Sequence, residues 1–225
     1  MSQLLLDIVP DSPPTLDNFV VGRNAELLSA LRHVLDNTWE GSSERCFFVW
    51  GESGSGKTHL LQACVRAAQD KHLSAIYAHG SVPPQVWDMG AVAVDEVALL
   101  DEAAQIGLFN LYNQMRESGG LLLVSGIESP LHLKLRDDLR TRLGWGLVYQ
   151  VHGLSDEEKT LALEQYAQVK GYALPPEVTQ YLLRHGRRDL PSLLAVLDAL
   201  DAHSLSLHRA PTVPLLKQVL QKELK

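Results

Sequence analysis

Short apolar runs alternate with helical patterns over the first two thirds of the chain. The runs have the length and composition of buried strands and fall at residues 46–51, 74–80, 91–96, 120–126 and 146–154. Between them, apolar side chains recur at helical spacing over residues 24–35, 58–70 and 101–118. Strands that alternate with helices predict a parallel sheet covered on both faces, which is an α/β fold.

The pattern changes after Leu154, where helical spacing continues without further strands. Ser155 and Glu158 form the S-x-x-E pattern of a capping box, which predicts a helix to about residue 169. Three more helical segments follow, at residues 175–185, 190–203 and 212–223. We therefore expect an α/β domain over residues 16–153 and a small all-helical subdomain over residues 154–225.

Residues 1–15 fit neither pattern and predict a flexible N-terminal peptide followed by a spacer. VPDSPPTLD (9–17) holds three prolines and two aspartates, which is typical of an extended spacer. The leucines before it cannot bury themselves, so they pack on their own domain, aggregate or bind another protein. No Lys or Arg precedes them as in a signal peptide, and no apolar run approaches the ~20 residues of a membrane span. We expect a cytoplasmic protein without a membrane partner.

The amino-acid composition and net charge argue against some classes of function. The chain has 225 residues, of which 45% are hydrophobic and 21% charged, as in an ordinary globular protein. Twenty basic against 27 acidic residues give a net charge of −7, which argues against strong autonomous DNA binding. Cys46 and Cys64 lie in no metal-binding pattern, so we expect buried, reduced thiols.

The segment GESGSGKT (51–58) matches the phosphate-binding pattern G-x-x-x-x-G-K-[ST] between a predicted strand and a predicted helix. Its backbone N–H groups and the helix N-terminus suit the phosphates of ADP or ATP. Lys57 is expected to reach the β- and γ-phosphates, and the Thr58 hydroxyl is expected to bind Mg²⁺. The other residues expected at the nucleotide are Gly51, Ser53, Gly54, Ser55 and Gly56.

The strand AVAVDE (91–96) ends in two acidic residues, about forty residues after the phosphate-binding loop. Asp95 is placed to hold Mg²⁺ through water, and Glu96 to orient an attacking water. The alternative is a pair of acids at the solvated end of a strand.

Together these motifs resemble the AAA+ ATPases, and within them the DnaA-like family with its shorter Hda-type members. The most specific segments are DNFVVGRN (17–24), RTRLGWGL (140–147) and LSDEEK (154–159). The resemblance implies an AAA+ P-loop domain, with a parallel sheet flanked by helices, followed by a helical lid. The initiator carries a further helix-turn-helix domain. This chain ends at Lys225, directly after the lid, so we expect that domain to be absent.

The resemblance implies roles for two segments of the α/β domain. Arg142 falls at the position of the family's arginine finger, which is offered to ATP on a neighbouring subunit. The alternative is a surface arginine in a charged helix, since Arg136 and Arg140 lie close by. Phe19, Val20 and Val21 match the segment that lies along the adenine, although an apolar staple before a helix has the same pattern.

Two positions depart from the family pattern. Pro191 stands where the lid's nucleotide-sensing arginine is expected. Arg187 and Arg188 are candidate substitutes, and the alternative is that the sensor is lost. Gly126 stands where the initiator has an acidic residue, which leaves Ser125 as the polar candidate. Both departures argue against efficient hydrolysis by this chain itself, whereas Lys57 and Glu96 argue for it.

The resemblance also implies a role for QLLLDI (3–8) as a peptide that docks on the DNA polymerase sliding clamp. Gln3 matches a polar rim contact, and Leu4, Leu6 and Ile8 match the pocket residues. A short extended segment with apolar anchors is a common peptide-recognition mode.

Three functions follow. The first is a negative regulator of replication initiation, a nucleotide-bound adaptor that rides the clamp and stimulates ATP hydrolysis on the DnaA initiator through Arg142. The second is a helicase loader or free-standing P-loop ATPase whose own ATP cycle is the output. The third is a scaffold at the clamp that binds nucleotide without hydrolysing it. The sequence leaves open self-association and the choice between ADP and ATP.

Overall fold

The computed structural model describes residues 13–36, 44–83, 89–187, 189–207 and 209–223. The chain divides into two compact units, one containing Pro13–Gly153 and the other containing Leu154–Lys225. The first unit has a five-stranded sheet in the order β2-β3-β4-β1-β5, and every neighbouring pair is parallel. The strands are β1 (Cys46–Trp50), β2 (Ala75–His79), β3 (Ala91–Asp95), β4 (Leu121–Gly126) and β5 (Leu147–Gln150).

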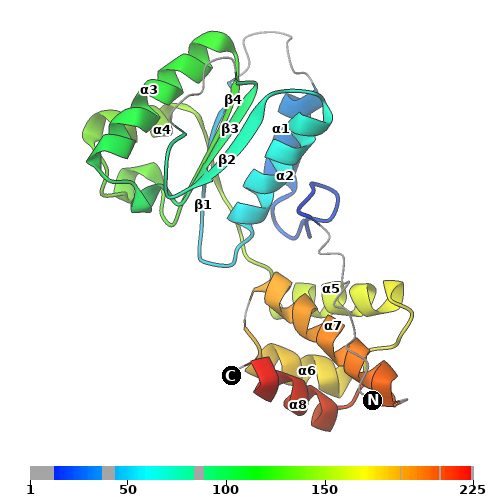
Figure 1. The fold of residues 1–225 in the computed structure, drawn as a ribbon. Helices are drawn as coiled ribbons and strands as arrows, with labels where there is room; N and C mark the ends of the chain where they lie inside the picture. Colours follow the sequence, from blue (N-terminus) through cyan, green and yellow to red (C-terminus); the bar gives the residue numbers. More distant parts are fainter. Residues whose placement is uncertain (1–12, 37–43, 84–88, 188, 208, 224–225) are drawn as a thin grey trace, which may run out of the picture. The chain divides into compact units, whose positions relative to one another are not determined.

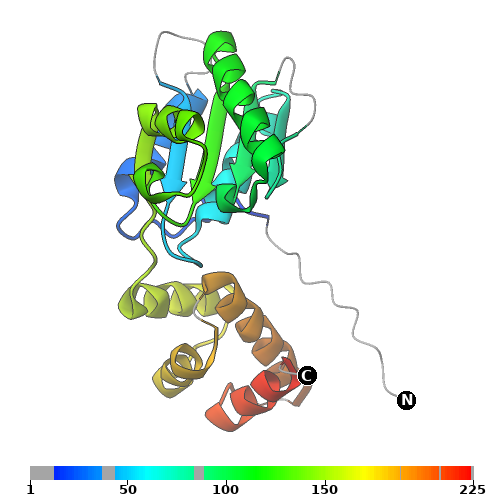
Figure 2. The same cartoon turned by 90° about the vertical axis from the view of Figure 1, so that its left-hand side faces the viewer.

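Helices cover both faces of this sheet (Figures 1 and 2). Helices α1 (Ala25–Asp36) and α2 (Lys57–Asp70) cover one face, while α3 (Glu102–Ser118) and α4 (Asp137–Trp145) cover the other. Two short 3-10 helices, η1 (Val97–Leu99) and η2 (Pro130–His132), follow β3 and β4. The arrangement confirms the predicted α/β fold with a parallel sheet between helices.

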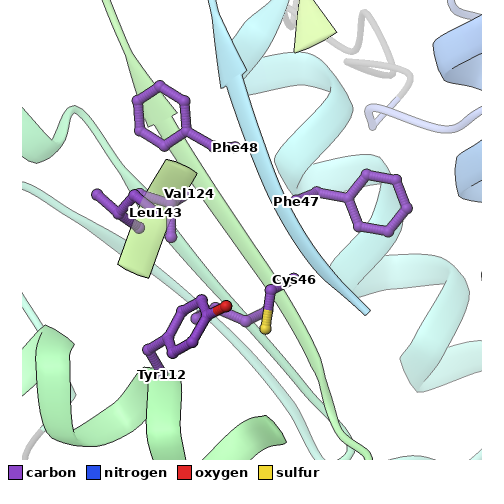
Figure 3. A pocket seen from close by; sticks show the side chains of 7 residues that line it. Cys46, Phe47, Phe48, Tyr112, Val124 and Leu143 are labelled. Carbon is purple, nitrogen blue, oxygen red and sulfur yellow. The ribbon is translucent and has the colours of Figure 1, made fainter. Parts of the chain in front are cut away.

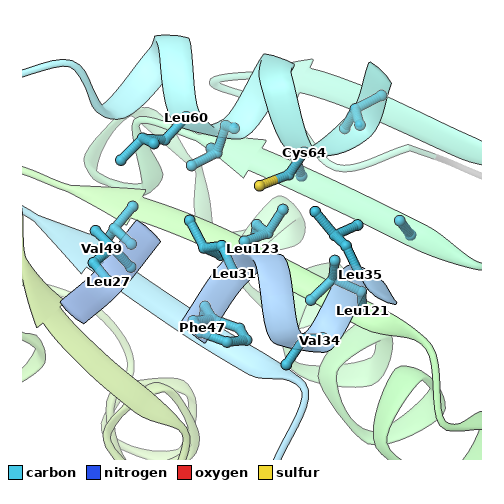
Figure 4. Packing of buried hydrophobic residues seen from close by; sticks show 14 of the residues in the cluster. Leu27, Leu31, Val34, Leu35, Phe47, Val49, Leu60, Cys64, Leu121 and Leu123 are labelled. Atoms are coloured by element: carbon cyan, nitrogen blue, oxygen red, sulfur yellow. The ribbon is translucent and has the colours of Figure 1, made fainter. Parts of the chain in front are cut away.

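Strand β1 supplies side chains to both apolar cores because successive residues of a strand point to opposite faces. Phe47 and Val49 pack with α1 and α2, where Leu31 and Leu123 lie beside them (Figure 4). Cys46 and Phe48 pack on the other face, with α3 and α4. A strand buried on both faces must be apolar throughout, which is why CFFVW was recognisable in the sequence.

The core beneath α3 contains one polar atom without a partner. Tyr112 is 1% exposed, and its hydroxyl has no hydrogen-bond partner in the part of the chain that the structure describes. Figure 3 shows this oxygen turned toward Cys46, and the hollow between the surrounding side chains is too narrow for a water molecule. Burial raises the pKa of Tyr112 and that of Cys46 to about 12. Cys46 and Cys64 are both free and buried, as predicted.

Replacing Tyr112 by phenylalanine should therefore stabilise the α/β domain. The change keeps the ring and removes a buried hydroxyl that has lost its hydrogen bond to water, a penalty of about 1–3 kcal/mol. We expect the free energy of unfolding to rise by about 1 kcal/mol in urea titrations. Tyr166→Phe is the matched control, because the Tyr166 hydroxyl donates to Asp198 at 2.7 Å and its loss should destabilise. A Tyr112→Phe variant less stable than wild type would mean that the hydroxyl has a partner.

The second unit is a bundle of helices with its own apolar core, as predicted for the lid. Its helices are α5 (Asp156–Val169), α6 (Pro176–His185), α7 (Leu190–Leu207) and α8 (Val213–Glu223). The predicted capping box is present, with the Glu158 N–H donating to Ser155 Oγ at 3.2 Å and the Ser155 N–H donating to Glu158 Oε2 at 2.7 Å. Asp198 links α7 to α5 by accepting hydrogen bonds from Tyr166 and pairing with Lys170 at 3.0 Å.

Within the described ranges, α7 is the one helix long and apolar enough to cross a membrane by length and composition alone. The sequence analysis did not single it out because Asp198 and Asp201 interrupt its apolar residues. Leu193, Leu197 and Leu200 are buried in the core of the lid. A core helix of a folded domain has this same composition, so the finding is weak evidence for a membrane span.

Helix α4 is an element that the hydrophobic pattern did not predict, although the alternative interpretation of Arg142 placed that residue in a charged helix. Only Leu139 and Leu143 of its nine residues are buried, one helical turn apart, and charged side chains occupy most other positions. Two apolar positions are too few to establish a helical period. The helix ends at Trp145, and its C-cap is Gly146, where a Cβ would lie 2.3 Å from the carbonyl oxygen of Cys46.

Candidate nucleotide-binding site

The phosphate-binding loop connects β1 to α2 at the C-terminal end of the sheet, and two of its glycines are required by their surroundings. A Cβ on Gly51 would lie 2.3 Å from the carbonyl oxygen of Val151. Gly56 has a φ of 103°, and a Cβ there would lie 2.9 Å from Cε2 of Phe19. The loop therefore closes tightly between the end of β5 and the segment before α1, with no room for side chains at these positions.

The start of α2 has features that suit an anionic ligand. Gly56 is the N-cap and makes no side-chain capping bond to the first turn. The neighbouring Ser55 is 7% exposed, and its hydroxyl has no hydrogen-bond partner in the described part of the chain. Uncapped N–H groups and a buried orphan hydroxyl are donors that a phosphate oxygen would satisfy.

Lys57 lies against the loop that it follows. Its side chain is nearly buried, and Nζ donates to the carbonyl oxygens of Gly51 at 2.7 Å and Glu52 at 2.9 Å. Burial lowers the pKa of Lys57, while the nearby carboxylates of Asp95 and Glu96 oppose that shift. The lysine thus ties the loop together and places a cation beside the helix N-terminus.

Asp95 is the polar centre of the site. Its carboxylate is fully buried and accepts hydrogen bonds from Ser125 Oγ, from Thr58 Oγ1 at 2.7 Å and from the Tyr77 hydroxyl at 2.7 Å. His79 Nδ1 lies 3.8 Å from the same carboxylate. Burial alone would raise the pKa of Asp95, but these three hydroxyl donors outweigh it and hold the pKa below its ordinary value. The group is therefore a carboxylate at neutral pH.

Glu96 has a left-handed backbone conformation, with φ 56° and ψ 60°. Such a conformation is uncommon for a residue other than glycine and costs about 1–3 kcal/mol. It is held by the Glu96 N–H, which donates to Ser125 Oγ at 2.9 Å and to Asp95 Oδ1 at 3.1 Å. The strained turn brings the half-buried Glu96 side chain to the carboxyl edge of the sheet, where open α/β sheets bind their ligands.

Thr58 and Asp95 suit a magnesium ion, because Mg²⁺ prefers oxygen ligands and usually binds through one or two protein groups and substrate phosphates. Across the described residues, no group of three or more His, Cys, Asp or Glu side chains is arranged to hold a metal. A cation at Thr58 and Asp95 would therefore depend on the phosphates of a nucleotide.

The segment expected at the adenine runs beside the phosphate-binding loop. Phe19 is buried against Gly56, and its ring lies 5.6 Å from that of His59 in a tilted arrangement. Val20 is half-buried, and Val21 is 37% exposed. Phe19 belongs to the core under α1 and α2, so the two valines are the accessible members of the segment.

Residues 13–17, which the sequence assigned to an extended spacer, are held against α1 and α2. His59 Nε2 lies 3.0 Å from the carbonyl oxygen of Thr15, and Arg32 donates to the carbonyl oxygen of Leu16 at 3.2 Å. Arg32 also pairs with Asp17 at 3.0 Å. The anchoring groups come from two helices distant in sequence, which is why the spacer composition did not reveal them.

Comparison with known proteins places this site in a family. Residues 11–81 match a model of the bacterial DnaA ATPase domain, and residues 156–220 match a model of the Hda lid domain. The chain belongs to the DnaA-like AAA+ family, with a lid of the Hda type. The recognition made from the sequence motifs is thereby confirmed.

Solved structures agree on the fold. Domain III of the Thermotoga maritima initiator DnaA is 19% identical, with a TM-score of 0.74 over 92% of this chain and 95% of that one. AMPPCP-bound DnaA from Aquifex aeolicus is 21% identical, with a TM-score of 0.69 over 84% of this chain. The match spans 65% of the length of the Aquifex initiator. These structures show the fold alone, while the two family models support a DnaA-related regulatory role.

The three arginines of the RTRLGWGL region differ in their partners. Arg136 pairs with Asp138 at 2.9 Å, and Arg140 pairs with Asp137 at 2.8 Å. Arg142 has no carboxylate partner within the described ranges, and its guanidinium carbon lies 4.3 Å from the centroid of the Trp145 ring. Among the described residues, no acidic side chain therefore engages the N–H donors of Arg142.

The departures from the family pattern have physical consequences. A Cβ on Gly126 would lie 2.8 Å from Cζ of Phe48, so an acidic side chain there would have to displace a core ring. Ser125 is fully buried and already engaged with Asp95 and Glu96. Arg187 lies 3.3 Å from Asp189, its ion-pair partner.

Some predicted site residues lie outside the described residues. They are Arg188 of the lid and the four residues of the clamp-binding peptide, Gln3, Leu4, Leu6 and Ile8.

The sequence analysis missed Tyr77, Trp145 and Phe109. Tyr77 reaches Asp95 because β2 pairs in parallel with β3, and this pairing is not readable from composition. Trp145 follows Arg142 by three positions, which is a contact spacing on a helix, so predicting α4 would have revealed it. Phe109, on α3, has its ring centroid 5.6 Å from the Arg142 guanidinium carbon.

Proposed function

We propose that this chain is a nucleotide-bound adaptor that switches off DNA replication initiation. In this proposal it docks on the DNA polymerase sliding clamp through Gln3, Leu4, Leu6 and Ile8, and offers Arg142 to ATP bound by the DnaA initiator. The added guanidinium accelerates hydrolysis of that ATP and leaves the initiator in its inactive state. Such a protein works in the cytoplasm, beside the replication machinery.

The observation that carries the proposal is the contrast among Arg136, which immediately precedes α4, and Arg140 and Arg142, which lie on it. A finger must keep its N–H donors available for the charge that develops on a transferring phosphoryl group. Arg136 and Arg140 are each engaged by an aspartate, while Arg142 lies over an aromatic ring. This contrast favours Arg142 over its neighbours, and the Hda-type lid favours an adaptor over other AAA+ proteins.

Binding of ADP or ATP is supported by the phosphate-binding loop. Among the described residues the Ser55 hydroxyl is buried without a partner, and the N-terminus of α2 has no side-chain cap. The positively charged ammonium group of Lys57 lies at the same loop. Thr58 and Asp95 would hold a Mg²⁺ ion that accompanies the phosphates, where it would neutralise phosphate charge. In this proposal Ser55 and Lys57 contact the phosphates, and Gly51 and Gly56 keep the loop free of side chains that would not fit there.

Replacing Lys57 by alanine should weaken ADP binding by about 1.5–3 kcal/mol, the value of a hydrogen bond to a charged group. Lys71→Ala is the matched control. Lys71 caps the other end of α2 and donates to the carbonyl oxygen of Leu35 at 2.6 Å, so its loss should lower stability without changing affinity. Calorimetric titration with ADP and the ADP-induced rise in unfolding temperature measure the two effects. If Lys57→Ala bound ADP with wild-type affinity, the proposed role of this loop in nucleotide binding would be rejected.

A second candidate is a helicase loader or free-standing P-loop ATPase whose own ATP cycle is the output. Glu96 favours it, because its strained backbone brings a carboxylate to the carboxyl edge of the sheet, where it could orient water. Against it stand Gly126, which has no room for an acidic side chain, and Ser125, whose hydroxyl is already engaged. A third possibility, a scaffold that binds nucleotide without hydrolysing it, predicts neither its own hydrolysis nor stimulation of the initiator.

One reconstituted assay separates these functions. Hydrolysis of radiolabelled ATP bound to the initiator is measured with the adaptor and clamp loaded on DNA. The adaptor should accelerate it only when both Arg142 and the clamp-binding peptide are intact. Hydrolysis by the adaptor alone, at the same rate with and without the initiator, would support the free-standing ATPase instead.

A further inference from the structure

The Arg142 side chain is held by aromatic rings from two helices. Trp145, the last residue of α4, places its ring centroid 4.3 Å from the guanidinium carbon, and Phe109 of α3 lies 5.6 Å from it on a helix that packs against α4. A guanidinium over an aromatic face is attracted to the ring while its N–H groups remain able to donate. The rings therefore restrain Arg142 without occupying the donors that a phosphate needs.

Trp145 contributes little to the core. Its side chain is 55% exposed, whereas Leu139 and Leu143 of the same helix are buried in the core under α3. An indole that is mostly exposed gains little from burial. The Trp145 ring centroid lies 4.3 Å from the guanidinium carbon of Arg142 and 6.0 Å from that of Arg116. Arg142, the nearer cation, has no carboxylate partner among the described residues, which indicates that Trp145 has a role in placing it.

We infer that Trp145 is a positioning residue, a platform that holds the Arg142 guanidinium ready for the partner's ATP. The inference rests on the proposed function of Arg142. A long, flexible side chain must give up rotamer freedom when it meets its target, and a platform that restricts it beforehand lowers that cost. Misplacement of a catalytic group by about 1 Å can cost 10²-fold in rate. Losing the platform should therefore lower the maximal rate more than the affinity for the partner.

The test uses full-length adaptor loaded on the clamp and single-turnover hydrolysis of initiator-bound ATP, titrated with each variant. Trp145→Leu keeps an apolar side chain but removes the π face, and we expect about a tenfold lower maximal rate with an unchanged half-saturating concentration. Trp145→Phe restores a ring and should recover the rate to within about threefold. Leu131→Ala removes another exposed apolar side chain of the same domain, 81% exposed, and should match wild type.

Combining the variants shows whether Trp145 acts through Arg142. In an Arg142→Ala background, Trp145→Leu should have no further effect, because the platform has nothing left to position. An unchanged maximal rate in Trp145→Leu, with Arg142→Ala inactive, would overturn the platform and leave the proposed function standing. A raised half-saturating concentration at normal maximal rate would also overturn it, in favour of a docking contact. Full activity of Arg142→Ala would overturn the proposed function itself.

Discussion

Replacing Arg142 by alanine is expected to lower stimulated hydrolysis of initiator-bound ATP by about 10³-fold. A finger supplied in trans stabilises charge that appears only in the transition state, so its loss lowers the rate without weakening the assembly. The variant should remain folded, because Arg142 makes no ion pair that its absence would break within the described ranges. Nucleotide affinity and clamp binding should equal those of wild type.

Arg140 provides a matched control on the same helix. It carries the same charge as Arg142, but it pairs with Asp137 at 2.8 Å. Arg140→Ala should therefore keep the stimulated rate within a few-fold of wild type, since exposed ion pairs contribute little. Arg142→Lys should remain as slow as the alanine variant, because an ammonium lacks the planar fork of donors.

The measurement is single-turnover hydrolysis with saturating clamp-loaded adaptor. Full activity of Arg142→Ala would reject the trans finger and direct attention to Arg140 or Arg136. A large loss in both Arg140→Ala and Arg142→Ala would indicate that the charge of the α4 surface, rather than one guanidinium, acts on the partner.

The sequence predicted those parts of the fold whose signals are local. Strands β1, β3 and β4 are buried on both faces, so their apolar runs were unambiguous. The capping box of α5 is complete within four residues. Lys57 and Thr58 belong to one contiguous motif, so the loop could be assigned before its geometry was known.

What the sequence could not predict depends on contacts between distant segments. Asp95 was expected at a metal, but its three hydroxyl partners come from α2, β2 and β4 and require the strand order to be known. The lack of space for a side chain at Gly126 is caused by the Phe48 ring of a neighbouring strand. The family resemblance favoured Arg142 as the finger, but the ion pairs that distinguish it from Arg136 and Arg140 could not be predicted from spacing.

Replacing both Gln3 and Leu6 by alanine is expected to abolish clamp association and to lower stimulated hydrolysis about 10²-fold at limiting adaptor. Tethering to a clamp raises the local concentration of the catalytic face, and avidity of this kind contributes 10²–10⁴-fold. The loss should disappear at high adaptor concentration, because the finger itself is intact. Folding and ADP affinity should not change, since a chain terminus contributes little to a core.

The anchoring of residues 13–17 makes this tether shorter than the spacer composition suggests. The Asn18 side chain donates to the carbonyl oxygen of Pro13 at 3.1 Å, and His59 holds Thr15. Only residues 9–12 separate the peptide from this anchored segment, a reach of at most about 14 Å at ~3.3–3.6 Å per residue. In the proposed docking, a tether of this length would hold the domain close to the clamp and limit the directions it can face.

The decisive comparison is between two leucine variants of the peptide. In an extended segment alternate side chains point to opposite sides, so Leu6→Ala should lose most clamp binding while Leu5→Ala keeps most of it. Clamp pull-down and surface plasmon resonance measure clamp binding. Hydrolysis of initiator-bound ATP at limiting adaptor concentration measures the effect on stimulation. Inserting about twelve Gly/Ser residues after Ser12 should preserve clamp binding but lower the stimulated rate, because effective concentration falls as a linker exceeds the span it must bridge. Equal clamp binding by wild type and the Gln3/Leu6 double variant would reject the docking peptide and return its leucines to their own domain.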